Sequence, residues 1–290
     1  MPNYVYFLLA VAGLIVGYII YGSIVAKIFG ADENRPTPAK TMADGVDYVD
    51  MPMWKVWLIQ LLNIAGVGPV FGPILGALYG PSALLWIVIG TIFAGAVHDY
   101  FSGMLSVRYK GANVPTIVGY NLGNVAKQVM RVFAVILLLL VGVVFVAAPA
   151  GLLAKLTPDY MDQMFWVAVI FAYYFLATIL PIDKIIGRLY PLFGAVLIIM
   201  AVGMTVTMFT NGCEFYNWAS FPNNHPQQLP IFPLVFITIA CGALSGFHAT
   251  QSPLMSRCLS NEKQGKAVFY GGMVAEGFIG LVWATVGMTF

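Results

Sequence analysis

The sequence predicts an all-α, multi-pass membrane protein with about eight transmembrane helices. Three observations predict this class. Hydrophobic residues make up 60% of the 290 residues and charged residues only 9%, long apolar stretches follow one another, and the basic residues group on one side of them. A soluble fold has no interior large enough for this apolar surface, whereas a lipid bilayer accommodates it. We therefore expect residues 1–290 to form a single transmembrane domain with no separate soluble domain.

Charge and cysteine content exclude several other classes. The net charge of +2 is small, and no long basic run is present, so nucleic acid is not an expected partner. The three cysteines (Cys213, Cys241 and Cys258) lack metal-ligand spacing and an even-numbered disulfide pattern. The sequence thus predicts neither a bound metal nor a cofactor, and it contains no catalytic motif that would indicate an enzyme.

Apolar stretches of membrane-spanning length recur along the whole chain. A helix needs about 20 apolar residues to cross the hydrocarbon core. Eight stretches approach or exceed this length: 4–28, 56–79, 83–107, 129–154, 164–181, 186–210, 231–254 and 267–290. The stretch 56–79 is rich in glycine and proline, so we expect an interrupted or kinked span there.

The basic residues test this topology. With the N-terminus on the outer side, thirteen of the fourteen Lys and Arg residues fall on the inner side, and only Lys155 lies outside. Such a split is the positive-inside pattern of membrane proteins. It predicts an inner loop at 30–54 and an outer loop at 211–230. The chain ends at Phe290 inside an apolar run, so we expect it to be part of a longer protein.

The first unusual feature inside a span is the segment Gly66–Pro73. Two prolines remove backbone donors, and the glycines allow the backbone to leave helical geometry. Non-helical backbone at membrane depth is tolerated where protein or a wet cavity receives its polar groups. Gly66, Gly68, Pro69 and Gly72 are therefore candidate substrate-binding positions. The alternative is a close-packing stripe, because glycines recur every four residues from Gly68 to Gly80.

Three further polar features interrupt apolar spans: the pair His98–Asp99, the run Ser245–Pro253 and the lone Glu276. Ionisable residues inside a membrane are costly and by default indicate function, although a purely structural pairing is the alternative. Pro253 is expected to interrupt its helix. At about 1.5 Å per residue, Gly66, Asp99, His248 and Glu276 each lie roughly 14–16 Å from the nearest inner basic residue. All four features are thus expected near the middle of the bilayer.

The two interrupted spans are five spans apart and enter from opposite faces. Interrupted helices in corresponding positions of inverted repeats indicate a transporter's binding site. The first repeat would comprise spans two to six, and the second would begin at span seven. About three helices of the second repeat would then be missing from this chain.

Several motifs resemble the carbon starvation protein A family. They are Ile64–Pro73, Ala94–Asp99, Ala240–Ala249, Asn261–Glu262 and Tyr270–Glu276, and the resemblance extends from about residue 30 to the end. It implies a bacterial inner-membrane carrier with the amino acid–polyamine–cation, leucine-transporter-like architecture. It also implies uptake of peptides or pyruvate during carbon starvation.

The sequence therefore predicts a secondary transporter in the lipid bilayer, coupled to H⁺ or Na⁺. Backbone near Gly66–Gly72 is expected to bind substrate together with Ser245, Gly246, His248, Gln251 and Ser252. Asp99 and Glu276, with His98, are the candidates for carrying the coupling ion. The alternatives are an intramembrane metalloenzyme, which would retain bound metal, and a channel, which would conduct without saturation. The oligomeric state and the identity of the substrate stay open.

Overall fold

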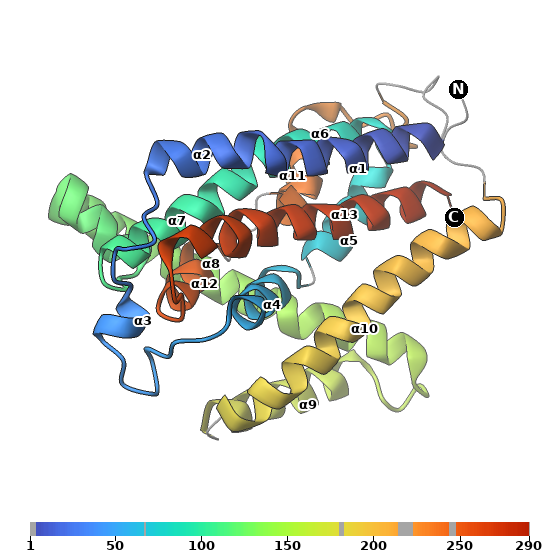
Figure 1. Ribbon diagram of the computed structural model, residues 1–290. Helices are drawn as coiled ribbons and strands as arrows, with labels where there is room; N and C mark the ends of the chain where they lie inside the picture. Colours follow the sequence, from blue (N-terminus) through green and yellow to red (C-terminus); the bar gives the residue numbers. More distant parts are fainter. Residues whose placement is uncertain (1–3, 67, 180–182, 214–222, 244–247, 290) are drawn as a thin grey trace.

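The computed structural model describes residues 4–66, 68–179, 183–213, 223–243 and 248–289 (Figure 1). Within these ranges the chain is helical and forms no strand, apart from one isolated bridge between Met51 and Leu259. The all-α prediction is confirmed. The helices are α1 (Tyr4–Ile19), α2 (Tyr21–Phe29), α3 (Pro38–Thr41), α4 (Met53–Ile64), α5 (Gly68–Ala77), α6 (Ser82–Gly90), η1 (Thr91–Gly95), α7 (Ala96–Arg108), α8 (Val114–Leu156), α9 (Gln163–Ile179), α10 (Asp183–Thr210), α11 (Ile231–Ala243), α12 (His248–Ser256), η3 (Glu262–Gln264), η4 (Lys266–Tyr270) and α13 (Gly271–Thr289).

Five helices of the described chain are long and apolar enough to cross a membrane, or six if one bent pair counts as a single span. The protein is therefore a multi-pass membrane protein. The apolar helices within 163–176 and 231–240 coincide with two further predicted stretches but are shorter. The expected count of eight spans thus stays a prediction.

One of the two expected interruptions coincides with a helix boundary, and the other stays a prediction because it falls on residues outside the described ranges. Helices α4 and α5 meet at an angle of 51°, in the segment where Gly66, Gly68 and Pro69 favour a break. Helix α11 ends at Ala243 and α12 begins at His248, and residues 244–247 lie outside the described ranges. One expectation is wrong: Pro253 does not end its helix, because α12 continues to Ser256. A proline near the end of a short helix removes few backbone hydrogen bonds, which makes it tolerable there.

Helix α13 is the central element of the bundle. It contacts α1, α4, α5, α6, α7, α10 and α11, and Figure 1 shows it running between α1 and α5. Small residues permit these close contacts. An added Cβ on Gly277 would lie 2.5 Å from Thr91, and one on Gly103 would lie 2.5 Å from the ring of Phe269. Close approach through glycine is typical of helix packing in membranes.

Two π-helical turns lie in the spans that carry Asp99 and Glu276. They are η1, directly before α7, and η4, directly before α13. The hydroxyl of Tyr270, at the end of η4, donates a hydrogen bond of 2.9 Å to the carbonyl oxygen of Ile92 in η1. The two wide turns are therefore joined to each other. Single π-turns inside α-helices are frequent at functional sites.

The segment 31–52 connects α2 to α4 and includes α3; we call it the strap. It corresponds to the predicted inner loop 30–54. The exposed carboxylate of Asp44 accepts backbone N–H bonds from Val46, Asp47 and Tyr48 at 2.8–2.9 Å. These bonds hold the pKa of Asp44 below its usual value, and the bond from Tyr48 has the largest effect. The strap is thus locally ordered by its own turn.

The hairpin of α8 and α9 differs from the rest of the bundle. The most apolar stretch of α8 has no buried residue, although its mean hydropathy is the highest among the candidate spans. Helix α8 also begins earlier than the predicted stretch 129–154, because a surface helical segment precedes the non-helical Gly123 (φ 88°).

The described part of the predicted outer loop 211–230 covers the end of α5. The ring of His225 in this loop lies 4.8 Å from that of Tyr79. Residues 214–222 of that loop lie outside the described ranges.

Candidate functional site

Four helices bring polar side chains together in the interior of the bundle. Gln60 comes from α4, Asp99 from α7, His248 and Ser252 from α12, and Glu276 from α13. All five are 0% exposed. We call this group the polar cluster. Such a concentration of buried polar groups is costly in a membrane interior unless they partner one another.

Asp99 is the best-partnered member. The Gln60 Nε2 group donates to Oδ1 at 3.0 Å and to Oδ2 at 3.1 Å, and the Ser252 hydroxyl donates to Oδ1. Gln60 Nε2 also lies 3.0 Å from Ser252 Oγ. The Nδ1 atom of His248 lies 3.2 Å from Oδ1. Two side chains, Gln60 and Ser252, thus donate hydrogen bonds to one buried carboxylate.

Glu276 has the opposite environment. Neither of its carboxyl oxygens has a hydrogen-bond partner among the described residues. Its closest charged or titratable contact is His248, whose Nε2 lies 3.8 Å from Oε2. The imidazole of His248 therefore lies between two acids, with one nitrogen toward each.

His98 lies beside the cluster rather than inside it. Its ring is edge-to-face with that of His248, with the two centroids 5.9 Å apart, and its side chain is exposed on α7. His98 thus connects the enclosed imidazole to the outside of the bundle.

The glycine- and proline-rich positions lie alongside the cluster. The carbonyl oxygen of Pro69 lies 3.8 Å from the position that a Cβ on Gly280 would occupy, one turn beyond Glu276 on α13. Pro69 and Gly72 are buried. Gly66 lies against Phe145 of α8, only 2.5 Å from the position of an added Cβ. Close packing therefore accounts for the position of Gly66.

The structure gathers part of the predicted site. Asp99, His248, Ser252 and Glu276 meet, and Gly68, Pro69 and Gly72 lie in the neighbouring helix. Gln251 is on α12 but is only partly buried, and it is not a hydrogen-bond partner of the described cluster. Ser245 and Gly246 fall outside the described ranges. Gln60 was missed by sequence reasoning, although an amide in the apolar run of α4 is a detectable signal.

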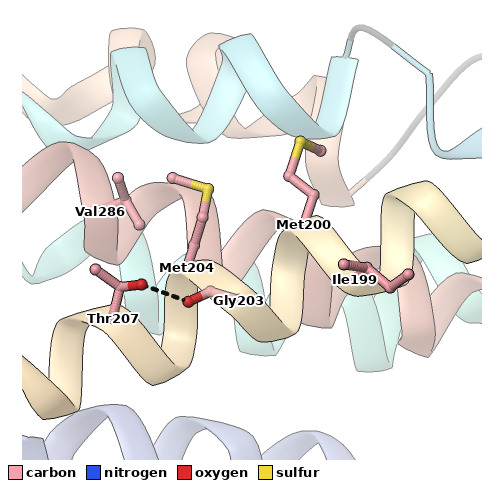
Figure 2. Close-up of a pocket in the computed structure, with 6 residues that line it drawn as sticks. All are labelled: Ile199, Met200, Gly203, Met204, Thr207 and Val286. Atoms are coloured by element: carbon pink, nitrogen blue, oxygen red, sulfur yellow. Dashed lines mark hydrogen bonds between the residues drawn. The ribbon is translucent and has the colours of Figure 1, made fainter.

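The described cavities are apolar and lie elsewhere. Figure 2 shows one of about 360 Å³ between α10 and α13, where the Thr207 hydroxyl donates to the Gly203 carbonyl at 2.8 Å. Its lining is Ile199, Met200, Gly203, Met204, Thr207 and Val286. A polar solute finds no charged partner there, so the polar cluster is the candidate site. Within the described residues, no group of three or more His, Cys, Asp or Glu is arranged to hold a metal ion.

Fold and site together define a multi-pass helical membrane protein with a polar site enclosed among four of its helices. The profile of the family "Carbon starvation protein CstA" matches residues 3–161 and 154–289. The chain belongs to this family.

Curated relatives agree with this assignment. An uncharacterized membrane protein of Haemophilus influenzae is 51% identical, with 98% of this chain and 91% of that protein aligned. The peptide transporter CstA of Campylobacter jejuni is 31% identical over 94% of this chain, and that of Escherichia coli is 27% identical over 92%. The chain spans about half the length of these two transporters, 48% and 47%. No solved structure matches.

The alignments also reveal an internal difference. The alignment with the Haemophilus influenzae protein covers 336 positions, more than the 290 residues of this chain. The relative therefore contains residues that have no counterpart here. The two matched segments of the family profile overlap at residues 154–161.

Proposed function

We propose that the chain functions as a secondary transporter that imports a small carbon compound, a peptide or pyruvate, during carbon starvation. The observation that carries this proposal is the polar cluster, which is fully enclosed and lies where the two interrupted spans meet. Relatives named peptide transporters make a peptide the first substrate to test.

The positions of the helices support an inverted-repeat fold with eight spans in this chain. The five long helices, the bent pair and the two shorter apolar helices coincide with the eight predicted stretches. The halves of the interrupted spans also pair reciprocally, α5 with α11 and α4 with α12. Paired interrupted helices at a repeat interface are the usual setting of a transporter's binding site.

The distribution of basic residues supports an inner-membrane protein with the N-terminus outside. Arg35, Arg108, Arg257 and Lys263, all predicted to be inside, meet at the end of the bundle where the strap lies. That end would face the cytoplasm under the positive-inside rule.

The division of roles follows the environments of the residues. Backbone groups of Gly66, Gly68, Pro69 and Gly72, with His248, Gln251 and Ser252, would bind the substrate. Ser245 and Gly246 remain proposed members of this set. His98, Asp99 and Glu276 would couple transport to an inward gradient of H⁺ or Na⁺, because protonation or cation binding removes the cost of a buried carboxylate.

Uptake by the reconstituted full chain tests this function. Proteoliposomes would be given a labelled dipeptide or labelled pyruvate, with an inward proton gradient, an inward sodium gradient or neither. We expect saturable uptake of one compound, at least tenfold faster with one gradient, and its loss in Asp99→Asn. Lys263→Gln, at an exposed pair remote from the cluster, should retain wild-type uptake. Failure of both compounds to move would refute the substrate assignment, and uptake linear in concentration would favour a channel.

A further inference from the structure

The two acids of the polar cluster have different donor environments, and this difference assigns them different tasks. Asp99 receives hydrogen bonds from Gln60 and Ser252 and has His248 at 3.2 Å. A carboxylate with several donors can keep its charge in a buried site. Nothing in this arrangement requires Asp99 to take up a proton.

Glu276 lacks such support. Among the described residues, neither of its carboxyl oxygens has a hydrogen-bond partner, and the side chain is 0% exposed. An isolated buried carboxylate avoids its desolvation cost by binding a proton. The described titratable groups that face Glu276 are His248 from α12 and, beyond it, Asp99 from α7. The adjoining positions of α4 and α5 contribute Gln60 and apolar residues, which do not titrate.

We propose that Glu276 carries the coupling proton, that His248 delivers it, and that Gln60 and Ser252 position Asp99 as a fixed counter-charge. This assignment rests on the proposed transport function. In the transfer step the Nε2–H bond of imidazolium His248 breaks and an O–H bond forms on Glu276, which leaves a neutral imidazole and a neutral carboxyl. His248 is then reprotonated from the side of His98, whose exposed ring lies against it.

The test separates exchange from accumulation in proteoliposomes. Glu276→Gln mimics a permanently protonated carrier, so labelled substrate should still exchange across the membrane within about threefold of the wild-type rate. Gradient-driven accumulation should fall more than tenfold. Loss of exchange and accumulation together, or retention of both, would contradict the assignment. If the wild type itself accumulates no substrate, the transport function fails instead.

The positioning role of Gln60 needs its own readout. Gln60→Met removes two N–H donors with little change in volume, so the carboxylate of Asp99 loses both hydrogen bonds from Gln60. The pH profile of exchange should therefore shift in Gln60→Met. An unchanged profile in Gln60→Met would refute the role.

A second, independent observation concerns the strap. The four helices of the polar cluster all end or begin at one end of the bundle, and the strap contacts each connection. Helix α4 follows the strap directly. Helix α7 ends at Arg108, η3 begins at Glu262 and leads through η4 into α13, and α12 is followed by Cys258 and Ser260.

Glu262 is the centre of these contacts and is 0% exposed. Its carboxylate accepts hydrogen bonds from Arg35 at 3.2 Å, Arg108 at 3.1 Å and the backbone N–H of Asp32 at 3.0 Å. Nearby, Ser260 donates to Asp50, and the Met51 N–H donates to the Cys258 carbonyl at 3.3 Å. The strap is thus fastened to both sides of the loop between α12 and α13.

We infer that the strap closes one access route to the polar cluster, and that release of Glu262 opens it. The ion pairs hold the ends of the site helices together from outside the membrane interior. Separating these ends requires Glu262 to release Arg108 of α7 as well as Arg35 and Asp32 of the strap. The inference is a conformational one and can be measured without any substrate.

The buried thiol of Cys258 reports on this opening. Burial raises the pKa of Cys258 and keeps the reactive thiolate scarce. In a Cys213→Ser/Cys241→Ser background, N-ethylmaleimide should label Cys258 slowly. Glu262→Gln should raise the labelling rate at least tenfold, whereas Lys263→Gln, which removes the exposed neighbouring pair with Glu33, should leave it unchanged.

A reversible cross-link tests whether the faster labelling of Cys258 comes from movement of the strap and not from unfolding of the protein. In the same background, Asp50→Cys and Ser260→Cys replace two side chains that are in contact, and their oxidation would fasten the strap. We expect labelling of Cys258 and transport to stop on oxidation and to return on reduction. Equal labelling in Glu262→Gln and wild type, or transport that persists in the oxidised protein, would overturn the inference.

Discussion

Replacing Glu262 by glutamine should destabilise the protein by about 3 kcal/mol. Removing one partner of a buried ion pair costs about 3–5 kcal/mol, and the lower value applies because both arginines reach solvent. The side chains of Arg35 and Arg108 are 42% and 30% exposed, whereas that of Glu262 is 0% exposed. Equilibrium unfolding in detergent, followed by tryptophan fluorescence, measures the loss.

Lys263→Gln is the matched control for this change. Lys263 and Glu33 form a 2.7 Å pair whose side chains are 58% and 54% exposed. An exposed pair contributes less than about 1 kcal/mol. Similar losses of unfolding free energy in the two variants would mean that Glu262 contributes no more than an exposed ion pair does. The strap would then be held by its other contacts.

The fold class was predictable because membrane burial acts on composition and periodicity directly. Helices α1, α6–α7 and α13 coincide with predicted stretches, since each carries enough apolar residues to cross the bilayer. Helix boundaries were less predictable. The early start of α8 depends on Gly123, whose positive φ lets a surface helical segment precede the span.

The depth of the candidate site in the bilayer was predictable from the sequence, but the set of residues that contact one another there was not. Counting residues along helices placed Asp99, His248 and Glu276 at one level, and the structure brings these three together. Rotation about a helix axis is not fixed by depth. The sequence therefore could not show that His248 lies between the two acids, or that Gln60 completes the environment of Asp99.

The contacts of Glu262 were also beyond sequence reasoning. Its partners are more than 150 residues away along the chain, and an acid beside a loop has many possible basic partners. Only the packing of α2, α7 and η3 at the same end selects Arg35 and Arg108. Long-range pairing of this kind depends on tertiary structure rather than on local pattern.

Replacing His248 by leucine should destabilise the protein in a strongly pH-dependent way. The imidazole separates Asp99 from Glu276, so leucine leaves two buried carboxyls with no cationic partner between them. We expect a loss of about 3–5 kcal/mol near pH 8, the cost of leaving a buried charge uncompensated. The folded variant reduces this cost by keeping protons that the unfolded chain has released.

The sign of the pH dependence follows from this proton count. Because the folded variant binds more protons than the unfolded chain, its stability falls as pH rises, by up to about 1.4 kcal/mol per pH unit for each extra proton. The loss should diminish on acidification and level off near pH 4, where carboxyls of the unfolded chain are also protonated. His225→Leu is the control, since His225 is buried against Tyr79 in the outer loop. Thermal unfolding of both variants from pH 5 to 9 should show a steeper slope in His248→Leu than in His225→Leu. Parallel profiles would show that His248 only fills space and does not compensate the two acids.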